Sequence, residues 1–218
     1  MEVAINRNTY AIRMSDTHEG RNSASLLINK MYAWRGYAST HRLDDNPHRL
    51  TLTAAEKNGD IVGTLSLGMD SPLGLLADEI FKPELDAYRA NGAKICEITK
   101  LAFDPAVQSK EALASLFHLA VIYARDLHHC TDIFIEVNPR HRRFYQEMLG
   151  FVLLGEARTN PRVKAPAYLL CVSLAYVTEQ IQRYGGSGHG NADIRSFYPL
   201  AFSPREERGI IERLLVVH

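Results

Sequence analysis

The stretch Lys94–Pro105 reads KICEITKLAFDP, and it decides which fold the chain can adopt. Its apolar residues follow the pattern of a β-strand that the proline ends, which predicts a strand over about 94–103. Polar Glu97, Thr99 and Lys100 interrupt this pattern, although a strand buried on both faces is normally apolar. Because a carboxylate that is buried, ionised and unpaired costs several kcal/mol, two alternatives remain. Either the strand borders a cleft, or Glu97 and Lys100 belong to a structural ion-pair network.

The segments that follow this strand predict a parallel crossover. Over Ser109–His128 apolar residues recur every three or four positions, which predicts a helix with one apolar stripe. A strand is expected over Thr131–Val137, and then a helix over Arg140–Leu149 with Gly150 as its C-cap. When a long helix connects two strands of one sheet, those strands are parallel neighbours.

The amino-terminal half predicts antiparallel strands. Asn58-Gly59 separates two apolar runs and is the strongest short-range hairpin signal. A helix is expected over about 18–34, with Ser15 or Asp16 as its N-cap. The polar segment Ala38–Arg49 is a candidate mobile lid. The other expected elements are strands at Tyr10–Met14, Leu50–Glu56, Ile61–Leu67, Phe151–Gly155 and Tyr168–Leu174, and helices at Leu75–Phe81, Glu84–Ala90 and Tyr176–Tyr184.

This order of elements predicts an α/β (α+β) fold, a mixed central sheet with helices on both faces. Residues 1–184 are expected to form one domain. Residues 185–218 add a linker, GGSGHG at Gly185–Gly190, and an amphipathic helix after Ser203, where S-P-R-E is an N-terminal capping pattern. The apolar stripe of that helix either docks on its own domain or mediates oligomerisation.

The composition excludes several classes of protein. The 25 basic and 25 acidic residues give a formal net charge of zero, so general binding of nucleic acid is not expected. The three cysteines lie far apart beside apolar residues, which favours buried free thiols in a reducing cytosol and no metal site. The chain has no apolar run of membrane-span length and no signal-peptide core at its amino terminus. A soluble, cytoplasmic protein is therefore expected.

Two stretches carry a resemblance to a known superfamily. The segment Asn138–Phe151, NPRHRRFYQEMLGF, resembles the late signature of the GNAT acyltransferase fold, in which an asparagine, a [LF]-Tyr pair and a Gly-Phe pair recur. In that fold the tyrosine commonly protonates the departing thiolate. KICEITKLAFDP resembles the central GNAT strand, whose backbone binds the pantetheine arm of a thioester donor beside a splayed parallel strand pair. The resemblance covers roughly Tyr10–Ala175.

One departure from the GNAT pattern bears on the donor. Enzymes of this fold that use coenzyme A usually carry R/Q-x-x-G-x-G/A before the next helix, where glycines let backbone N–H groups approach the pyrophosphate. In the register that starts at Gln108, Glu111 and Leu113 stand where those glycines would be. A carboxylate repels the pyrophosphate and a leucine blocks its approach, so a nucleotide-bearing donor is disfavoured.

A closer resemblance implies which reaction the protein catalyses. Glu97–Ala102, EITKLA, resembles the E-x-[ST]-[RK]-[LF]-[AV] strand of acyl-homoserine lactone synthases, which use acyl carrier protein. The segments YAWRGY and LDDNP are more similar to N-acyl amino acid synthases of the N-acyltyrosine synthase type. The resemblance implies transfer of a long-chain acyl group from acyl carrier protein to the α-amine of an amino acid such as tyrosine. It implies no bound cofactor beyond the carrier's phosphopantetheine. The alternatives are a lactone synthase, a coenzyme A-dependent N-acetyltransferase and a non-catalytic module that binds carrier protein or lipid.

Amide formation from a thioester assigns the catalytic candidates. Glu97 is the candidate base for the ammonium, directly or through a water, and Tyr145 is the candidate acid for the thiolate. The alternatives are that Glu97 only holds the sheet and that Tyr145 only packs. Lys100, Leu101, Ala102 and Phe103 are expected to bind the pantetheine or acyl group, and backbone N–H groups of Leu101 or Phe103 to stabilise the oxyanion.

Basic residues are the candidates for binding charged partners. A cluster at the start of a helix opposes the helix dipole, so an acidic carrier protein is expected to compensate it, unless the cluster is only a solvated face. The docking candidates are Lys110, Arg140, His141, Arg142 and Arg143, and Arg158, Arg162 and Lys164 are expected to extend the patch. Arg35 is the candidate for the carboxylate of the amino acid.

Overall fold

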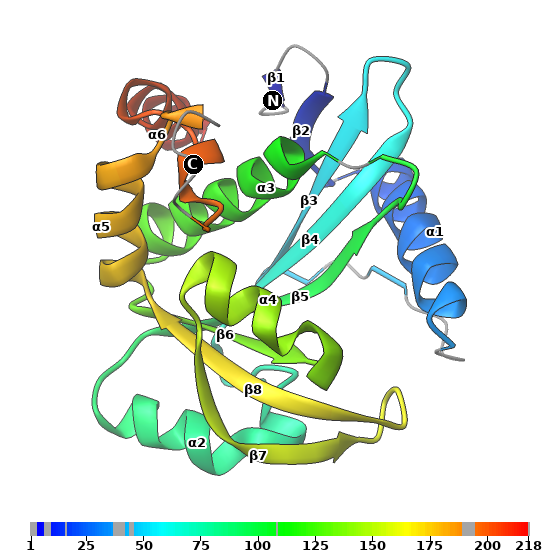
Figure 1. Cartoon of the computed structure of the whole chain (residues 1–218), viewed down its shortest axis with the longest axis vertical. Helices are drawn as coiled ribbons and strands as arrows, with labels where there is room; N and C mark the ends of the chain where they lie inside the picture. The colour runs from blue at the N-terminus through cyan, green and yellow to red at the C-terminus, as the bar shows by residue number, and fades with distance from the viewer. Residues whose placement is uncertain are drawn as a thin grey trace.

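The computed structural model describes residues 4–6, 10–15, 17–36, 42–43, 46–107, 109–188 and 195–217 (Figure 1). Within these ranges the chain forms an eight-stranded sheet in the order β1-β2-β3-β4-β5-β6-β8-β7. The strands are β1 (Ala4–Asn6), β2 (Tyr10–Met14), β3 (Arg49–Glu56), β4 (Ile61–Met69), β5 (Ile95–Phe103), β6 (Asp132–Val137), β7 (Val152–Asn160) and β8 (Ala165–Ser173). The helices are α1 (His18–Trp34), α2 (Asp78–Ala90), α3 (Lys110–Ile122), α4 (Pro139–Leu149), α5 (Leu174–Tyr184) and α6 (Pro204–Val217).

The β5–β6 pair is parallel and every other pair of neighbouring strands is antiparallel, which confirms the predicted crossover. Pairing between β5 and β6 covers only 95–98 and 132–135, and beyond Ile98 and Ile135 the two strands separate. On the other edge of β5 the register with β4 shifts between Thr64 and Ser66, and Lys100 takes a left-handed φ of 51°. A bulge of this kind bends a strand, so it helps to open the splayed pair that the resemblance implied.

Helices cover both faces of the sheet, as predicted (Figure 1). Cys96 and Ile98 of β5 lie in the main core, which α3, α4, α5 and the carboxy-terminal segment cover. Ile95 of the same strand lies in a second cluster beneath α2. Since side chains alternate along a strand, Glu97 points toward the α2 face. The helix α1 packs through Leu27, Ile28 and Met31 against the far end of β5.

Several local expectations are confirmed and a few are corrected. The hairpin between β3 and β4 and the C-cap at Gly150 are present. Thr17, rather than Ser15, caps α1, because Ser15 still belongs to the sheet, where its N–H donates to Thr51 O; Asp16 lies outside the described residues. The two short helices predicted at 75–81 and 84–90 are one helix, α2, kinked at Phe81.

The predicted basic loop between the last two strands is mostly strand. Arg158 lies within β7, and it pairs with Glu84 of α2. Arg162 lies in the turn after β7 and pairs with Glu79 and Glu136. These two arginines therefore do not extend a basic patch, because acidic side chains far away in the sequence neutralise them.

The carboxy-terminal segment packs on the main core. Ser203 and Glu206 form the predicted capping box at the start of α6, and buried Ile210 and Leu214 join the main core. The hydroxyl of Tyr198 donates to Leu149 O at 2.7 Å, and Glu207 pairs with Arg125 at 2.7 Å. Part of the apolar stripe of α6 thus docks on its own domain, while Leu215 and Val216 of the same helix stay exposed.

The remaining expectations concern the cysteines, membrane-spanning helices, metal sites and the candidate lid. The three cysteines are free and buried, as predicted. In the described ranges no helix is long and apolar enough to cross a bilayer, and no group of three His, Cys, Asp or Glu side chains is placed to hold a metal. Most of the candidate lid at 38–49, part of the LDDNP segment and Gln108 lie outside the described residues.

Candidate active site

A cleft of about 330 Å³ lies where β5 and β6 separate. We call it the cleft; its lining includes Thr99, Lys100, Glu136 and Tyr145. A groove of about 560 Å³ lies next to it and runs past Phe103 toward the start of α3. The two share four lining residues, which are Arg35, Leu101, His141 and Tyr145. One continuous depression thus connects the splayed strands with the amino terminus of α3.

The four pantetheine candidates on β5 have different environments. Lys100 and Leu101 line the cleft, and Leu101 and Phe103 line the groove. Ala102 is buried and its side chain packs against α1, so only its backbone is available to a ligand. The carbonyl of Lys100 accepts a hydrogen bond from Thr64 Oγ1 at 2.8 Å.

Tyr145 is one of the four residues that line both the cleft and the groove. It is 7% exposed, and its ring packs edge-on against Phe144 and Phe151, with ring centroids 5.1 and 5.9 Å away. Among the described residues its hydroxyl has no hydrogen-bond partner, and burial raises its pKa above the usual value. The ring therefore packs in the core while the residue also lines the cleft and the groove, so the packing role does not exclude the acid role.

Glu97 lies behind the cleft and is not part of its lining. Its Oε1 accepts from the N–H of Leu76 at 2.8 Å and its Oε2 from the N–H of Ala77 at 3.0 Å, so the carboxylate caps the start of α2. It is 2% exposed. Burial raises the pKa of Glu97 to about 6, although the two backbone N–H groups pull it down.

The raised pKa makes stability depend on pH. A carboxyl group whose folded pKa exceeds its unfolded value favours the protonated form, so its contribution is complete below about pH 4.5 and is lost as the pH rises through about 6. Relative to Glu97→Gln, we expect the unfolding free energy of the wild type to fall by about 2 kcal/mol between pH 4 and pH 7. Urea unfolding of both proteins at several pH values measures this. A difference that stays constant with pH would contradict it.

Glu136 and Thr99 are among the polar residues of the cleft lining that had no predicted role. Glu136 of β6 accepts from Asn160 Nδ2 and from Arg162 Nη2, both at 2.6 Å. Burial raises the pKa of Glu136, and Arg162 opposes this shift. Thr99 Oγ1 is buried and has no hydrogen-bond partner among the described residues. The charged residue within the apolar strand TDIFIEV is the signal that could have pointed to Glu136.

The basic cluster is divided among several places. Lys110 is exposed at the end of the groove, and Arg140 and Arg143 are exposed on α4, where Arg143 pairs with Glu147. His141 lines both the cleft and the groove. Burial lowers the pKa of His141, and the positive charges of Arg35 and Arg140 lower it further. The guanidinium of Arg142 lies 5.1 Å from the ring centroid of Tyr168.

The start of α3 shows how the groove ends. Ser109 caps the helix and accepts from the N–H of Ala112 at 3.1 Å. Glu111 and Leu113, which stand where a nucleotide cradle would have glycines, both line the groove. A side chain of the protein itself therefore occupies part of the helix terminus that a pyrophosphate would need.

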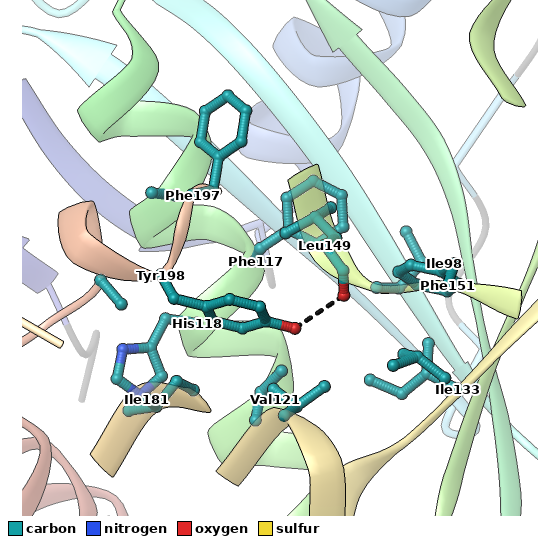
Figure 2. A pocket seen from close by; sticks show the side chains of 14 residues that line it. Ile98, Phe117, His118, Val121, Ile133, Leu149, Phe151, Ile181, Phe197 and Tyr198 are labelled. Carbon is teal, nitrogen blue, oxygen red and sulfur yellow. Dashed lines mark hydrogen bonds between the residues drawn. The ribbon is translucent and has the colours of Figure 1, made fainter. Parts of the chain in front are cut away.

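An apolar cavity of about 30 Å³ lies behind Tyr145, between α3, α5 and the carboxy-terminal segment (Figure 2). Ile98 lines both this cavity and the cleft. Phe117 and Phe151 also line it, and both pack edge-on against the ring of Tyr145. Figure 2 shows Tyr198 on the other side, with its hydroxyl bonded to Leu149 O.

Comparison with known proteins identifies the fold and the family. A solved structure of FeeM, an N-acyl amino acid synthase from uncultured soil microbes, is 26% identical, with a TM-score of 0.68 over 82% of this chain and 95% of that chain. An N-acetyltransferase structure from Lactobacillus plantarum is 15% identical, with a TM-score of 0.57 over 77% of this chain and 99% of that one. An acyl-CoA N-acyltransferase structure from Pseudomonas aeruginosa is 16% identical, with a TM-score of 0.53 over 74% and 97%.

The last two similarities show the acyltransferase fold alone, because their sequence identities are low. A search of curated protein sequences finds no match. The family model described as N-acyl amino acid synthase FeeM matches residues 23–173, well over half of the chain, and this range contains β5, β6, Glu97 and Tyr145. The chain therefore belongs to the FeeM family of N-acyl amino acid synthases, acyltransferases with the GNAT fold.

Proposed function

We propose that the protein transfers a long-chain acyl group from acyl carrier protein to the α-amine of an amino acid such as tyrosine. The observation that carries the proposal is the continuous depression, in which Tyr145 stands between a donor groove and a polar cleft. A thioester at Tyr145 would meet an amine that enters from the cleft.

The shape of the groove supports a carrier protein as donor. A phosphopantetheine arm would lie along the backbone of 101–103 and leave the protein near Lys110. Glu111 and the internal cap at Ser109 leave a pyrophosphate without a cradle. Acyl carrier protein presents the same arm without an adenine nucleotide, so it suits this groove better than coenzyme A.

The bonds and protons that change in the reaction show which groups the active site must supply. The acceptor ammonium loses one proton to a base, and the nitrogen attacks the thioester carbon and loses a second proton as the C–N bond forms. The C–S bond breaks, and the sulfur takes a proton from Tyr145, so one proton in total goes to solvent. Backbone N–H groups of Leu101 or Phe103 would stabilise the oxyanion, since β6 leaves this part of β5 unpaired.

The base in this proposal is Glu97, acting through a water. Its pKa of about 6 suits proton transfer near neutral pH. Both of its oxygens accept backbone N–H groups and the side chain lies outside the cleft lining, so an indirect route is the one its contacts leave open. Arg35 and Arg49 also line the cleft and suit the carboxylate of the amino acid.

The acyl chain would enter the apolar cavity behind Tyr145. A space of about 30 Å³ is comparable to the volume of one water molecule. A long chain therefore requires side chains such as Phe117 and Phe151 to move aside. The apolar lining favours hydrocarbon, because a cavity of this kind stays dry.

Mass spectrometry of the products tests the function. The purified protein is incubated with a pool of amino acids and with acyl carrier protein loaded with chains of several lengths, and in parallel with the matching coenzyme A thioesters. We expect N-acyl amino acids from the carrier-protein reactions and little from the coenzyme A reactions. Turnover with coenzyme A alone would overturn the choice of donor, and no amide from either donor would overturn the proposal.

Docking of an acidic carrier protein predicts a charge effect at the end of the groove. Lys110→Glu should raise the KM for acyl carrier protein about tenfold and weaken its dependence on salt, because a charge pair near the phosphopantetheine phosphate is replaced by repulsion. Lys82→Glu is the matched control, since Lys82 is an exposed lysine on α2 and does not line the groove. Equal KM values for the two variants would argue against docking at Lys110.

A further inference from the structure

The opening between β5 and β6 places two polar side chains opposite each other. The last paired residues are Ile98 and Ile135. One step further along the parallel register come Thr99 and Glu136, and both line the cleft. Since side chains alternate along each strand, both belong to the face that α2 covers. A hydroxyl and a carboxylate thus lie at the point where the hydrogen-bond ladder between β5 and β6 ends.

The contacts of Glu136 leave negative charge in excess. Arg162 pairs with Glu136 and also with Glu79, so one guanidinium serves two carboxylates and the group carries one net negative charge. Asn160 contributes a neutral amide to Glu136. Arg49, the cation on the β3 side of the cleft, acts on Glu97 and lowers its pKa. Arg35, Arg49 and Lys100 also line the cleft, and Glu136 is the one acidic side chain in its described lining, so the place directly beside this carboxylate is where an ammonium would bind.

Thr99 supplies a second, independent observation. Its Oγ1 is buried and has no hydrogen-bond partner among the described residues. Buried hydroxyl groups are nearly always paired, and one without a partner needs an explanation. A hydroxyl oxygen can accept a hydrogen bond, and an ammonium group has three N–H bonds to donate. A ligand cation between Thr99 and Glu136 would satisfy both side chains.

We propose that Thr99 and Glu136 bind the α-ammonium of the acceptor amino acid, which deepens the proposed function and rests on it. The ammonium donates one hydrogen bond to the Glu136 carboxylate and one to Thr99 Oγ1. Its nitrogen then lies at the opening of the strands, beside the backbone that receives the thioester and within the depression that Tyr145 lines. Arg162 and Asn160 are positioning residues, because they hold the carboxylate and do not touch the ligand.

Glu97 does not compete for this role. Its two oxygens accept the N–H groups of Leu76 and Ala77, and its side chain is absent from the cleft lining. Glu136 has the same chemistry but stands in the lining, with an exposed fraction of 11%. Binding of the ammonium and removal of its proton are thus assigned to different carboxylates.

Binding measured without any donor tests the site. Calorimetry compares L-tyrosine with 3-(4-hydroxyphenyl)propanoate, which has the same skeleton and carboxylate but lacks the amine. The wild type should bind tyrosine roughly ten- to a hundredfold more tightly, the range expected for hydrogen bonds to a charged group. In Glu136→Gln and in Thr99→Val the ratio of the two affinities should fall several-fold.

Two controls separate binding of the amine from damage to the fold. Glu84→Gln removes a carboxylate that also pairs with an arginine of the β7 region but lies outside the cleft, and it should leave the ratio unchanged. Thr99→Val does not touch the Glu136–Arg162 ion pair, so it remains informative if Glu136→Gln unfolds the protein. An unchanged ratio in Thr99→Val, or equal affinities of the wild type for both compounds, would overturn the inference.

The binding test of Thr99 and Glu136 and the product test of the proposed function can fail independently. If the wild type prefers tyrosine and the variants lose this preference, but no amide forms with acyl carrier protein, the amine site stands and the choice of donor fails. If amides form and the preference for the amine does not change in the variants, the proposed function stands and the assignment of Thr99 and Glu136 fails.

Discussion

Tyr145→Phe is expected to lower kcat about 10²-fold and to leave the KM for both substrates nearly unchanged. General acid catalysis typically raises a reaction rate by about 10²- to 10⁴-fold. Because a thiolate is a good leaving group, we expect the effect of Tyr145 to lie at the low end of this range. Burial raises the pKa of the Tyr145 hydroxyl, which by itself makes it a weaker acid. The same apolar surroundings raise the pKa of the departing thiol, so the proton transfer stays matched.

The fold should tolerate this change. The hydroxyl has no hydrogen-bond partner among the described residues, and the ring contacts with Phe144 and Phe151 persist in phenylalanine. Single-turnover kinetics with acyl carrier protein measure the chemical step, and a melting temperature confirms folding. Tyr176→Phe, at a tyrosine that is 39% exposed, should retain the wild-type kcat. A normal kcat in Tyr145→Phe would reduce the side chain to a packing role.

Glu97→Gln is expected to lower kcat/KM for amino acids by about 10²-fold or more, because an amide cannot take the proton of the ammonium. Glutamine keeps the shape of the side chain and one acceptor oxygen, so α2 keeps part of its cap. The loss of the second contact costs about 1–3 kcal/mol, which a folded domain usually survives.

A neutral nucleophile separates chemistry from structure in this variant. Hydroxylamine is unprotonated at neutral pH and needs no base before attack. Acylation of hydroxylamine by Glu97→Gln should therefore approach the wild-type rate, while acylation of tyrosine stays slow. If both rates fall equally, Glu97 only supports the sheet and α2. Glu84→Gln, a carboxylate outside the cleft, should change neither rate.

The fold was predictable from the sequence wherever the signals are local. The Asn58-Gly59 hairpin, the helix after Lys94–Pro105 and the Gly150 cap each depend on neighbouring residues, and all are present. Their order was enough to predict the parallel β5–β6 pair. Thr17 was missed as a cap because the hydrogen bond that occupies Ser15 comes from a strand far along the chain.

The candidate site was less predictable because its chemistry depends on long-range pairing. Glu97 and Tyr145 carried motifs, and their roles stay predictions. Nothing near Arg162 in the sequence shows that Glu79 and Glu136 neutralise it, so it was assigned to a basic patch. Thr99 and Glu136 line an open cleft because the ladder ends at Ile98, and no local pattern shows where a ladder ends.

The backbone of Leu76, just before α2, is linked by hydrogen bonds to the carboxylates of both Glu97 and Glu136. Its N–H donates to Glu97 Oε1, and its carbonyl accepts from Nη1 of Arg162, which in turn holds Glu136. A local unfolding event that frees the start of α2 would therefore displace the two acidic groups at the same time. The first turn of this helix and the acceptor side of the cleft should open as one cooperative unit. An amino acid bound as proposed would then have to enter through the mouth of the cleft, since loosening α2 would dismantle the proposed acceptor site.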